Sequence, residues 1–404
     1  MSLIRPFAGL RPLAHYAAEV MAPPYDVLNT EEARVQAKDK PRNFLHISKP
    51  EIDLPVGTDP YSEAVYAQGA AHLQHLRQQG VLQQDNQPSY YLYQLIMGDH
   101  QQTGIVALAN IADYATNRIR KHELTRPDKE DDRVRHIEAL NAQTGPVFLT
   151  YRQDPVIDTL VNRLTAQAAE VDVQATDGVK HRLWTVTDSA HIDTITTTFD
   201  AMSCLYIADG HHRSAAAARV AASRQAESAQ YFLSVIFPDN QMQILDYNRV
   251  VQDLNGLTVT EFLAHLERHF QVHPQPQAFK PQKSGEMGLF VAGQWYQLVL
   301  PAEKIPQHDP VAQLDVSLLT NYILTPLLGI TDLRRDKRID FVGGIRGLAA
   351  LEHRVTSGEM ACAFALYPTR LAALMAVADA NQVMPPKSTW FEPKLADGLV
   401  SHLL

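Results

Sequence analysis

The sequence has little cysteine and no long apolar run. Only Cys204 and Cys362 occur among its 404 residues, and they lack CxxC spacing. This excludes a cysteine zinc site and argues against a disulfide framework. The longest apolar runs are too short to span a membrane, and Met1–Leu10 shows no secretory signal. We therefore expect a cytoplasmic protein with no membrane partner.

Two further absences narrow the class of protein. The sequence contains neither a GxxxxGK[ST] phosphate loop nor a kinase-type glycine loop, which argues against the common nucleotide-binding folds. Positive charge is also scarce, because 36 Lys and Arg face 45 Asp and Glu for a net charge of -9. That balance argues against nucleic acid as a partner.

What the sequence does contain is ample material for packed cores, at 45% hydrophobic residues. The length fits two or three domains, or one elaborate domain with insertions. Residues 273–284 are rich in Pro and Gln and are the best linker candidate. We therefore predict an N-terminal and central α+β domain over residues 1–275 and a C-terminal α/β domain over residues 276–404.

A polar cluster follows a short apolar run in the middle of the chain. Leu205–Ala208 predicts a buried strand, the pair Asp209-Gly210 predicts a turn, and the Ala-rich residues 215–222 predict a helix. Backbone N–H groups and the helix dipole at such a helix N-terminus suit an anion such as phosphate. The cluster that would lie there comprises Asp209, Gly210, His211, His212, Arg213 and Ser214.

The residue types in this cluster fit phosphate chemistry. Gly210 allows a positive φ or a close approach of backbone to ligand. Arg213 offers a bidentate fork to phosphate, and Asp209 suits a metal ion or the proton of a hydroxyl. The alternative is that Asp209 is only an N-cap and that the histidines cover the turn.

Two earlier segments carry residues suited to the same chemistry. Two prolines stiffen the loop that presents Tyr25 and Asp26, which is either part of a substrate site or a connector. Lys121-His122-Glu123 precedes a helix predicted to begin at Pro127, and combines a cation, an imidazole and a carboxylate. A charged run of this kind can also be a solvated helix face.

Two later segments also carry residues suited to phosphate or substrate binding. Lys387, Ser388, Thr389 and Lys394 lie on a path fixed by prolines, and would form an anion clamp or belong to a strap that packs Trp390 and Phe391. Arg249, near a predicted sheet end, would face the substrate or be a strand-end polar residue.

The segments together resemble the bacterial and archaeal family known as domain of unknown function 1015. The matching pieces keep their order along nearly the whole chain. They are Ala-Pro-Pro-Tyr-Asp-Val at 22–27, Lys-His-Glu-x-Thr at 121–125, Asp-Arg at 132–133, Ala-Asp-Gly-His-His-Arg at 208–213 and Met-Pro-Pro-Lys-Ser-Thr-x-Phe at 384–391.

The Asp209–Arg213 piece is similar to the phosphate-binding motif of the ParB/sulfiredoxin-like superfamily. That superfamily includes free-serine kinases that use ADP or ATP, nucleotide switches of chromosome partition, and sulfiredoxins. The resemblance implies an α+β fold with a ParB/sulfiredoxin-like core around residues 205–251, a mixed sheet, and additional N- and C-terminal α/β elements. In the serine kinases the motif's aspartate activates the serine hydroxyl and a second, glutamate residue is required. Asp209 matches the first, and Glu123 or Glu31 is the candidate for the second.

The leading hypothesis is a phosphotransferase that moves a phosphoryl group from ADP or ATP, with Mg²⁺, to a small hydroxyl substrate such as free serine. Asp209, His211, His212 and Glu123 are the predicted catalytic residues, and Asp209 is also the predicted metal ligand. The predicted phosphate or nucleotide ligands are Gly210, Arg213, Ser214, Lys121, His122, Lys387, Ser388 and Thr389, and the predicted substrate ligands are Tyr25, Asp26 and Arg249.

Two alternatives stay open. One is a nucleotide-binding regulatory or scaffold protein without turnover, which would use the same phosphate site. The other is a metal-dependent hydrolase with His211, His212, Asp209 and Glu123 as ligands. Adjacent histidines at the start of a helix do not readily point at one ion, which disfavours it. The oligomeric state is left open, with a homodimer as one alternative.

Overall fold

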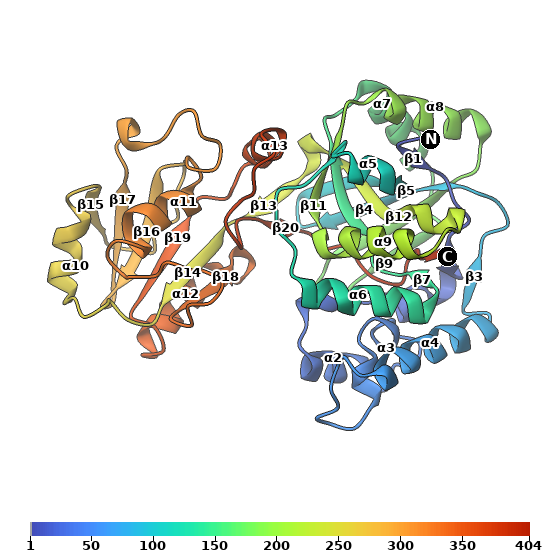
Figure 1. Cartoon of the computed structure of the whole chain (residues 1–404), viewed down its shortest axis with the longest axis horizontal. Helices are drawn as coiled ribbons and strands as arrows, with labels where there is room; N and C mark the ends of the chain where they lie inside the picture. Colours follow the sequence, from blue (N-terminus) through green and yellow to red (C-terminus); the bar gives the residue numbers. More distant parts are fainter. Residues whose placement is uncertain (1) are drawn as a thin grey trace. The chain divides into compact units, whose positions relative to one another are not determined.

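The computed structural model describes residues 2–404, which form two compact units (Figure 1). Unit 1 comprises the chain up to Met242 together with Pro393–Leu404, and unit 2 comprises Gln243–Glu392. The units therefore meet in sequence at residues 242–243 and 392–393, whereas the sequence placed its domain boundary at 275–276. Within residues 2–404, no helix is both long and apolar enough to cross a membrane.

Unit 1 is built on a nine-stranded mixed sheet. Its order is β6 (Ile119–Arg120), β11 (Leu205–Asp209), β8 (Val147–Tyr151), β12 (Tyr231–Pro238), β5 (His100–Asn110), β4 (Tyr90–Met97), β10 (Lys180–Val186) and β9 (Val171–Gln174), and β1 (Ile4–Arg5) pairs with β5. The pairs β11–β6 and β12–β8 are parallel and the others antiparallel. The mixed sheet confirms the predicted α+β class, and the ParB/sulfiredoxin-like core stays a prediction.

The central strands are apolar on both faces because helices cover the sheet. Strands β8 and β12 are buried along their whole length, and so are the first four residues of β11. In Figure 1 the N-terminal helices lie together at one end of unit 1, and α7 and α8 lie at the other. The helices are α1 (Ala17–Val20), α2 (Thr30–Ala37), α3 (Leu45–Ser48), α4 (Glu63–Gln78), α5 (Ile111–Ala115), α6 (Pro127–Leu140), α7 (Pro155–Thr165), α8 (Ser189–Ala201) and α9 (His211–Ser223).

Local signals in the sequence set several of these boundaries. Pro127 opens α6, as predicted, because its missing N–H would be unpaired there in any residue. Asn29 and Glu32 form a capping box at the start of α2. Two short pairs complete unit 1, β2 (Leu10–Pro12) with β3 (Leu82–Gln84) and β7 (Ala142–Gln143) with β21 (His402–Leu403).

The parallel pair β6–β11 brings two of the predicted segments together. Leu205 pairs with Ile119 and Tyr206 with Arg120, so the two strands run in the same direction and leave the sheet at the same edge. Residues 121–123 therefore lie next to Asp209 and the start of α9, although about ninety residues of sequence separate them. The sheet edge thus combines two segments that the sequence singled out separately.

Unit 2 has its own six-stranded sheet. The order is β15 (Gln271–Gln275), β17 (Gln294–Val299), β16 (Glu286–Val291), β19 (Cys362–Leu366), β14 (Tyr247–Val251) and β18 (Ile339–Gly343). Its helices are α10 (Val259–Leu266), α11 (Asp315–Leu319), α12 (Gly347–Thr356) and α13 (Leu371–Asp379), and β13 (Gln243–Leu245) pairs with β20 (Trp390–Glu392).

The linker predicted at 273–284 is wrong at its start. Residues 273–275 are the end of β15, which pairs antiparallel with β17. Pro274 is the reason for the difference, because a proline usually argues against a strand. It is tolerated here since β15 is an edge strand, where a missing N–H leaves no partner unpaired.

Replacing Gly210, in the turn between β11 and α9, should lower the free energy of unfolding for two separate reasons. Its φ of 97° lies in the left-handed region, and an added Cβ would stand 3.1 Å from Arg213 Nε and 3.3 Å from Val147 Cα. Gly178, in the β9–β10 turn, has a φ of 88° but no atom within 4 Å of an added Cβ. The control Gly178→Ala isolates the backbone cost of about 1–2 kcal/mol.

We expect Gly210→Ala to destabilise unit 1 by about 1 kcal/mol more than Gly178→Ala, or about 2–4 °C in melting temperature. Thermal unfolding of the full chain, followed by circular dichroism, measures both variants. Equal melting temperatures would show that the close packing around Gly210 has no energetic weight.

Candidate functional site

The candidate site forms at the N-terminus of α9. Gly210 is the N-cap, and its carbonyl accepts the first helical hydrogen bond from Ser214 N at 3.0 Å. Ser214 Oγ donates to the carbonyl of His211, so the hydroxyl that was predicted to bind phosphate takes part in the first helical turn. The backbone N–H groups of this turn give the site a partial positive charge.

Arg213 lies at the centre of the site and is 9% exposed. Its Nη1 donates to the carbonyl of Pro146, and its Nη2 lies 3.7 Å from Asp209 Oδ1 and 3.9 Å from Asp26 Oδ2. Asp209 Oδ2 is in turn 3.5 Å from Lys394 Nζ. The arrangement is an alternating cluster of two cations and two carboxylates, which come from three separate segments of the chain.

This cluster fixes the charge state of Asp209. Its burial by itself would raise the pKa of the carboxyl, but Lys394 and Arg213 outweigh that effect and hold the pKa well below its usual range. Burial alone would lower the pKa of Arg213, and Asp26 and Asp209 reverse that and raise it. Asp209 is therefore an ionised carboxylate at neutral pH whose charge is balanced by two cations.

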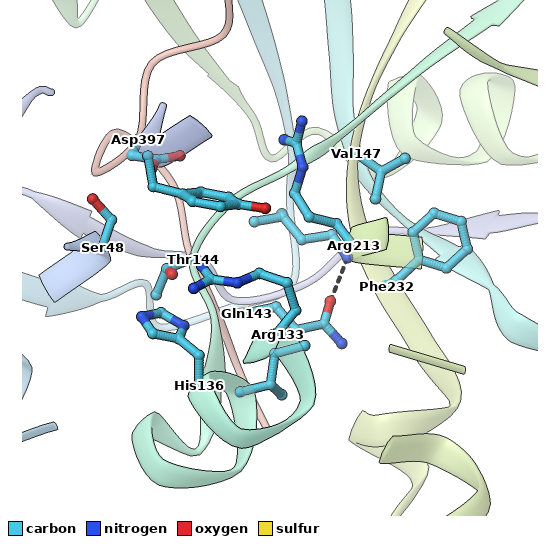
Figure 2. Close-up of a pocket in the computed structure, with 13 residues that line it drawn as sticks. Ser48, Arg133, His136, Gln143, Thr144, Val147, Arg213, Phe232 and Asp397 are labelled. Carbon is cyan, nitrogen blue, oxygen red and sulfur yellow. Dashed lines mark hydrogen bonds between the residues drawn. The ribbon is translucent and has the colours of Figure 1, made fainter. Parts of the chain in front are cut away.

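Behind this cluster is a small cavity of about 30 Å³ (Figure 2). It is lined by Tyr25, Arg133, Arg213 and Asp397 among other residues. Its volume suits an ordered water molecule and is far below that of a ligand pocket. The cavity therefore supports the site from beneath and is too small to hold a larger ligand.

Tyr25 and Asp397 form one wall of that cavity. The guanidinium of Arg133 stacks 4.0 Å from the ring centroid of Tyr25, and burial raises the pKa of Tyr25 to about 12. Asp397 is 2% exposed, and burial raises its pKa to about 7 although Arg213 and Arg133 act in the opposite direction. Tyr25 thus packs beneath the site, while Asp26 next to it reaches Arg213.

A second group of side chains lies at the same sheet edge. The rings of His122 and His211 meet edge to face at 4.5 Å, and Glu123 Oε2 is 3.7 Å from His211 Nδ1. Burial lowers the pKa of His122 to about 4 and that of His211 well below its usual value. Both imidazoles are therefore neutral at pH 7.

The remaining predicted residues of unit 1 point elsewhere. Lys121 Nζ lies over the ring of Tyr114 at 3.9 Å, and burial lowers its pKa. His212 Nε2 accepts a hydrogen bond from Arg126 N at 3.0 Å, so the hydrolase ligand set of His211, His212, Asp209 and Glu123 is not gathered at one point. Glu31 lies on α2 with Arg34 Nε at 3.9 Å.

The predicted residues of unit 2 form a separate cluster. Arg249 is 1% exposed, and its guanidinium donates to the carbonyls of Tyr247 and Lys387. Burial lowers its pKa to about 9. Ser388 Oγ donates to the carbonyl of Pro385 at 2.6 Å, and Thr389 follows it on the strap. Arg249 therefore holds the Pro385–Thr389 strap through backbone carbonyls, and its role as a substrate ligand stays a prediction.

Two further residues lie at the site although the sequence did not assign them to it. Lys394, predicted to belong to an anion clamp with Lys387, Ser388 and Thr389, lies in unit 1 beside Asp209. Asp397 was missed. The pair Asp397-Gly398 follows the apolar Leu395-Ala396, which is the same pattern as Ala208-Asp209-Gly210, and that repetition was an available signal.

The sequence of this chain matches a known protein family. The profile of the family described as "Protein of unknown function (DUF1015)" matches residues 4–317. The chain belongs to this family. The match confirms the resemblance drawn from the sequence motifs and covers unit 1 up to residue 242 together with the first part of unit 2. No curated protein matches this DUF1015 chain.

Several solved structures are similar to this DUF1015 chain at low identity. A free serine kinase in complex with AMP shares 13% identity at a TM-score of 0.36 over 71% of this chain and 86% of that one. A conserved hypothetical protein from Pyrococcus furiosus shares 14% at 0.35, over 73% and 94%. C-terminally truncated SbnI from Staphylococcus aureus shares 10% at 0.40, over 73% and 86%. Likeness at this level assigns neither a site nor a substrate.

The raised pKa of Asp397 predicts a pH-dependent stability. Between the pKa of about 3.9 in the unfolded chain and the folded value of about 7, the unfolded state loses its proton first, so the free energy of unfolding falls as pH rises through this window. Asp397→Asn removes this loss. We expect the variant to gain stability over the wild type from pH 4 to pH 8, on the order of a few kcal/mol.

Thermal unfolding across that pH range measures the gain. Asp131→Asn, at an exposed position of α6, serves as the control and should show no such trend. A constant difference between Asp397→Asn and the wild type from pH 4 to pH 8 would contradict the raised pKa.

Proposed function

We propose that this protein is a phosphotransferase that moves a phosphoryl group from ADP or ATP to a small hydroxyl compound. The observation that carries the proposal is the cluster at the start of α9, where Asp209 lies between Lys394 Nζ at 3.5 Å and Arg213 Nη2 at 3.7 Å. A helix N-terminus with two cations binds phosphate, and a carboxylate at the same point accepts a proton.

The proposed phosphate contacts come from backbone and side chains together. The N–H groups after Gly210 and the positive end of the α9 dipole face the terminal phosphate, and Lys394 and Arg213 neutralise its charge. Gly210 is needed for the turn that presents these N–H groups, because its φ of 97° disfavours any side chain there. Phosphoryl transfer needs mainly such positioning and charge neutralisation.

Asp209 is the proposed base. The acceptor oxygen attacks the terminal phosphorus, the bond from that phosphorus to the bridging oxygen of the nucleotide breaks, and the hydroxyl proton passes to Asp209. Lys394 and Arg213 hold its pKa low in the free protein. When the phosphate binds to these cations, they stabilise the charge of Asp209 less. The pKa of Asp209 then rises, and the carboxylate becomes a stronger base. The free-serine kinases also require a second carboxylate. Asp26 lies 3.9 Å from Arg213 Nη2, whereas Glu31 pairs with Arg34 on α2, so we assign that role to Asp26.

The two carboxylates also fit Mg²⁺. Asp209 and Asp26 have side chains 35% and 42% exposed, so their oxygens are accessible to an ion that prefers one or two carboxylates plus phosphate oxygens. Bound there, Mg²⁺ would offset the repulsion between the carboxylates and the nucleotide phosphates. Free serine is the first acceptor to test, because the Asp209–Arg213 motif is similar to that of free-serine kinases.

Nucleotide binding should depend on Arg213. We expect ADP or ATP with Mg²⁺ to raise the melting temperature of the wild type, and Arg213→Lys to lose most of the rise because an ammonium cannot form the same bidentate fork. Arg219→Ala is the matched control, since Arg219 lies on α9 and pairs with Glu130 and Asp131 at the surface. A thermal-shift screen that includes CTP and pyrophosphate measures this. If nucleotide raised the melting temperature of Arg213→Lys as much as that of the wild type, the phosphate site would not lie at the start of α9.

Turnover should depend on Asp209. We expect Asp209→Asn to lower the rate of acceptor phosphorylation by about 10²–10⁴-fold, because the amide cannot take the proton, while nucleotide binding persists. Asp131→Asn is the control on exposed surface. Nucleotide consumption and phosphoserine formation, followed by ³¹P NMR, measure both. Wild-type turnover in Asp209→Asn would exclude the role, and nucleotide binding without turnover in any acceptor screen would favour a regulatory protein.

A further inference from the structure

The phosphoryl transfer proposed above leaves His122, Glu123 and His211 without a role. They come from two backbone segments that the parallel pair β6–β11 brings to one sheet edge. His122 and His211 are 2% and 4% exposed, whereas the Glu123 side chain is 42% exposed. Two buried imidazoles and one accessible carboxylate thus face one another beside the start of α9.

We propose that His122, Glu123 and His211 bind one transition-metal dication of the Zn²⁺ type. One ligand atom from each residue lies within 4.8 Å of the other two. Ligand atoms in a tetrahedral site with metal bonds of about 2.0–2.1 Å are about 3.4 Å apart. Closing the site requires movements of about 1 Å, and Glu123 Oε2 is already 3.7 Å from His211 Nδ1.

An unsatisfied buried nitrogen points to the same ligand. Within the described part of the chain, His122 Nδ1 has no hydrogen-bond partner although it is inaccessible to solvent. Leaving such an atom unpaired costs about 1–3 kcal/mol, so native structures rarely keep one without a reason. A bound cation would satisfy it.

His211 can ligate through the nitrogen that faces Glu123. Its Nε2 accepts a hydrogen bond of 3.4 Å from His122 N, which is at the long end of the range for such bonds. Its Nδ1 lies 3.7 Å from Glu123 Oε2. An ion at Nδ1 selects the tautomer protonated at Nε2, at the cost of that one long hydrogen bond.

The donor set decides which ion binds. Two imidazole nitrogens and one carboxylate oxygen suit Zn²⁺ or Co²⁺, whereas Mg²⁺ prefers oxygen ligands throughout. Three protein ligands leave a fourth position open. His211 is the first residue of α9, so the ion would lie next to the start of that helix, and a phosphoryl oxygen is the fourth ligand that we infer. That last step rests on the proposed function, whereas metal binding itself does not.

Metal titration of the full chain tests the site without any nucleotide. Protein treated with EDTA and dialysed is titrated with Zn²⁺ by calorimetry and with Co²⁺ by visible absorption. We expect one equivalent of either ion to bind, with Mg²⁺ unable to displace it. His122→Ala and Glu123→Gln should each weaken binding about tenfold or more.

His212→Ala is the matched control, because this neighbouring histidine on α9 bonds to Arg126 N instead. It should bind the ion as the wild type does. If His122→Ala fails to fold, Glu123→Gln, which changes an accessible side chain, decides the outcome. No bound ion, or equal affinity in Glu123→Gln and the wild type, would overturn the site. Nucleotide shifts measured with Mg²⁺ alone report on the proposed phosphotransferase separately.

Discussion

The buried charge of Arg213 is the constraint on which the rest of unit 1 depends. A guanidinium that is 9% exposed costs several kcal/mol unless it is paired and hydrogen-bonded. Its partners are Asp26 from the N-terminal loop, the carbonyl of Pro146 before β8, and Asp209 at the end of β11. Because these segments must meet at one cation, the loop, the sheet edge and the helix start are held in register with one another.

Two aspartates near Arg213 have pKa values that are shifted in opposite directions. Asp209 and Asp397 each precede a glycine after an apolar pair, and both lie near Arg213. Asp209 also has Lys394 at 3.5 Å, and the cations dominate its pKa. Asp397 is buried at the cavity and desolvation dominates, so its pKa rises. One motif therefore yields an ionised carboxylate at the surface and a proton-binding one beneath it.

The Pro-rich segment near the C-terminus serves the two units differently. Pro385–Thr389 belongs to unit 2, where the buried Arg249 donates to backbone carbonyls of the segment. Lys394 belongs to unit 1, where it offsets the charge of Asp209. A cluster of lysines and hydroxyls that is continuous in sequence thus divides into an anchored strap and a charge at the candidate site.

The sequence by itself determined the local elements of the site. The apolar run 205–208, the Asp-Gly pair and the alanines after it specify a strand, a tight turn and a helix, and Pro127 specifies the start of α6. Such signals act over a few residues, so they can be read without the fold. They also suggested Arg213 and Asp209 as site residues.

Tertiary structure alone decided which side chains meet. The parallel register of β6 and β11 placed Glu123 at His211, and His212 turned toward Arg126. The return of the C-terminus brought Lys394 to Asp209 and Asp397 near Arg213. Pairings between residues this far apart in the sequence depend on strand order and register, for which a single sequence carries no local signal. The sequence therefore predicted which residues have suitable chemistry, but it did not predict which of them contact one another.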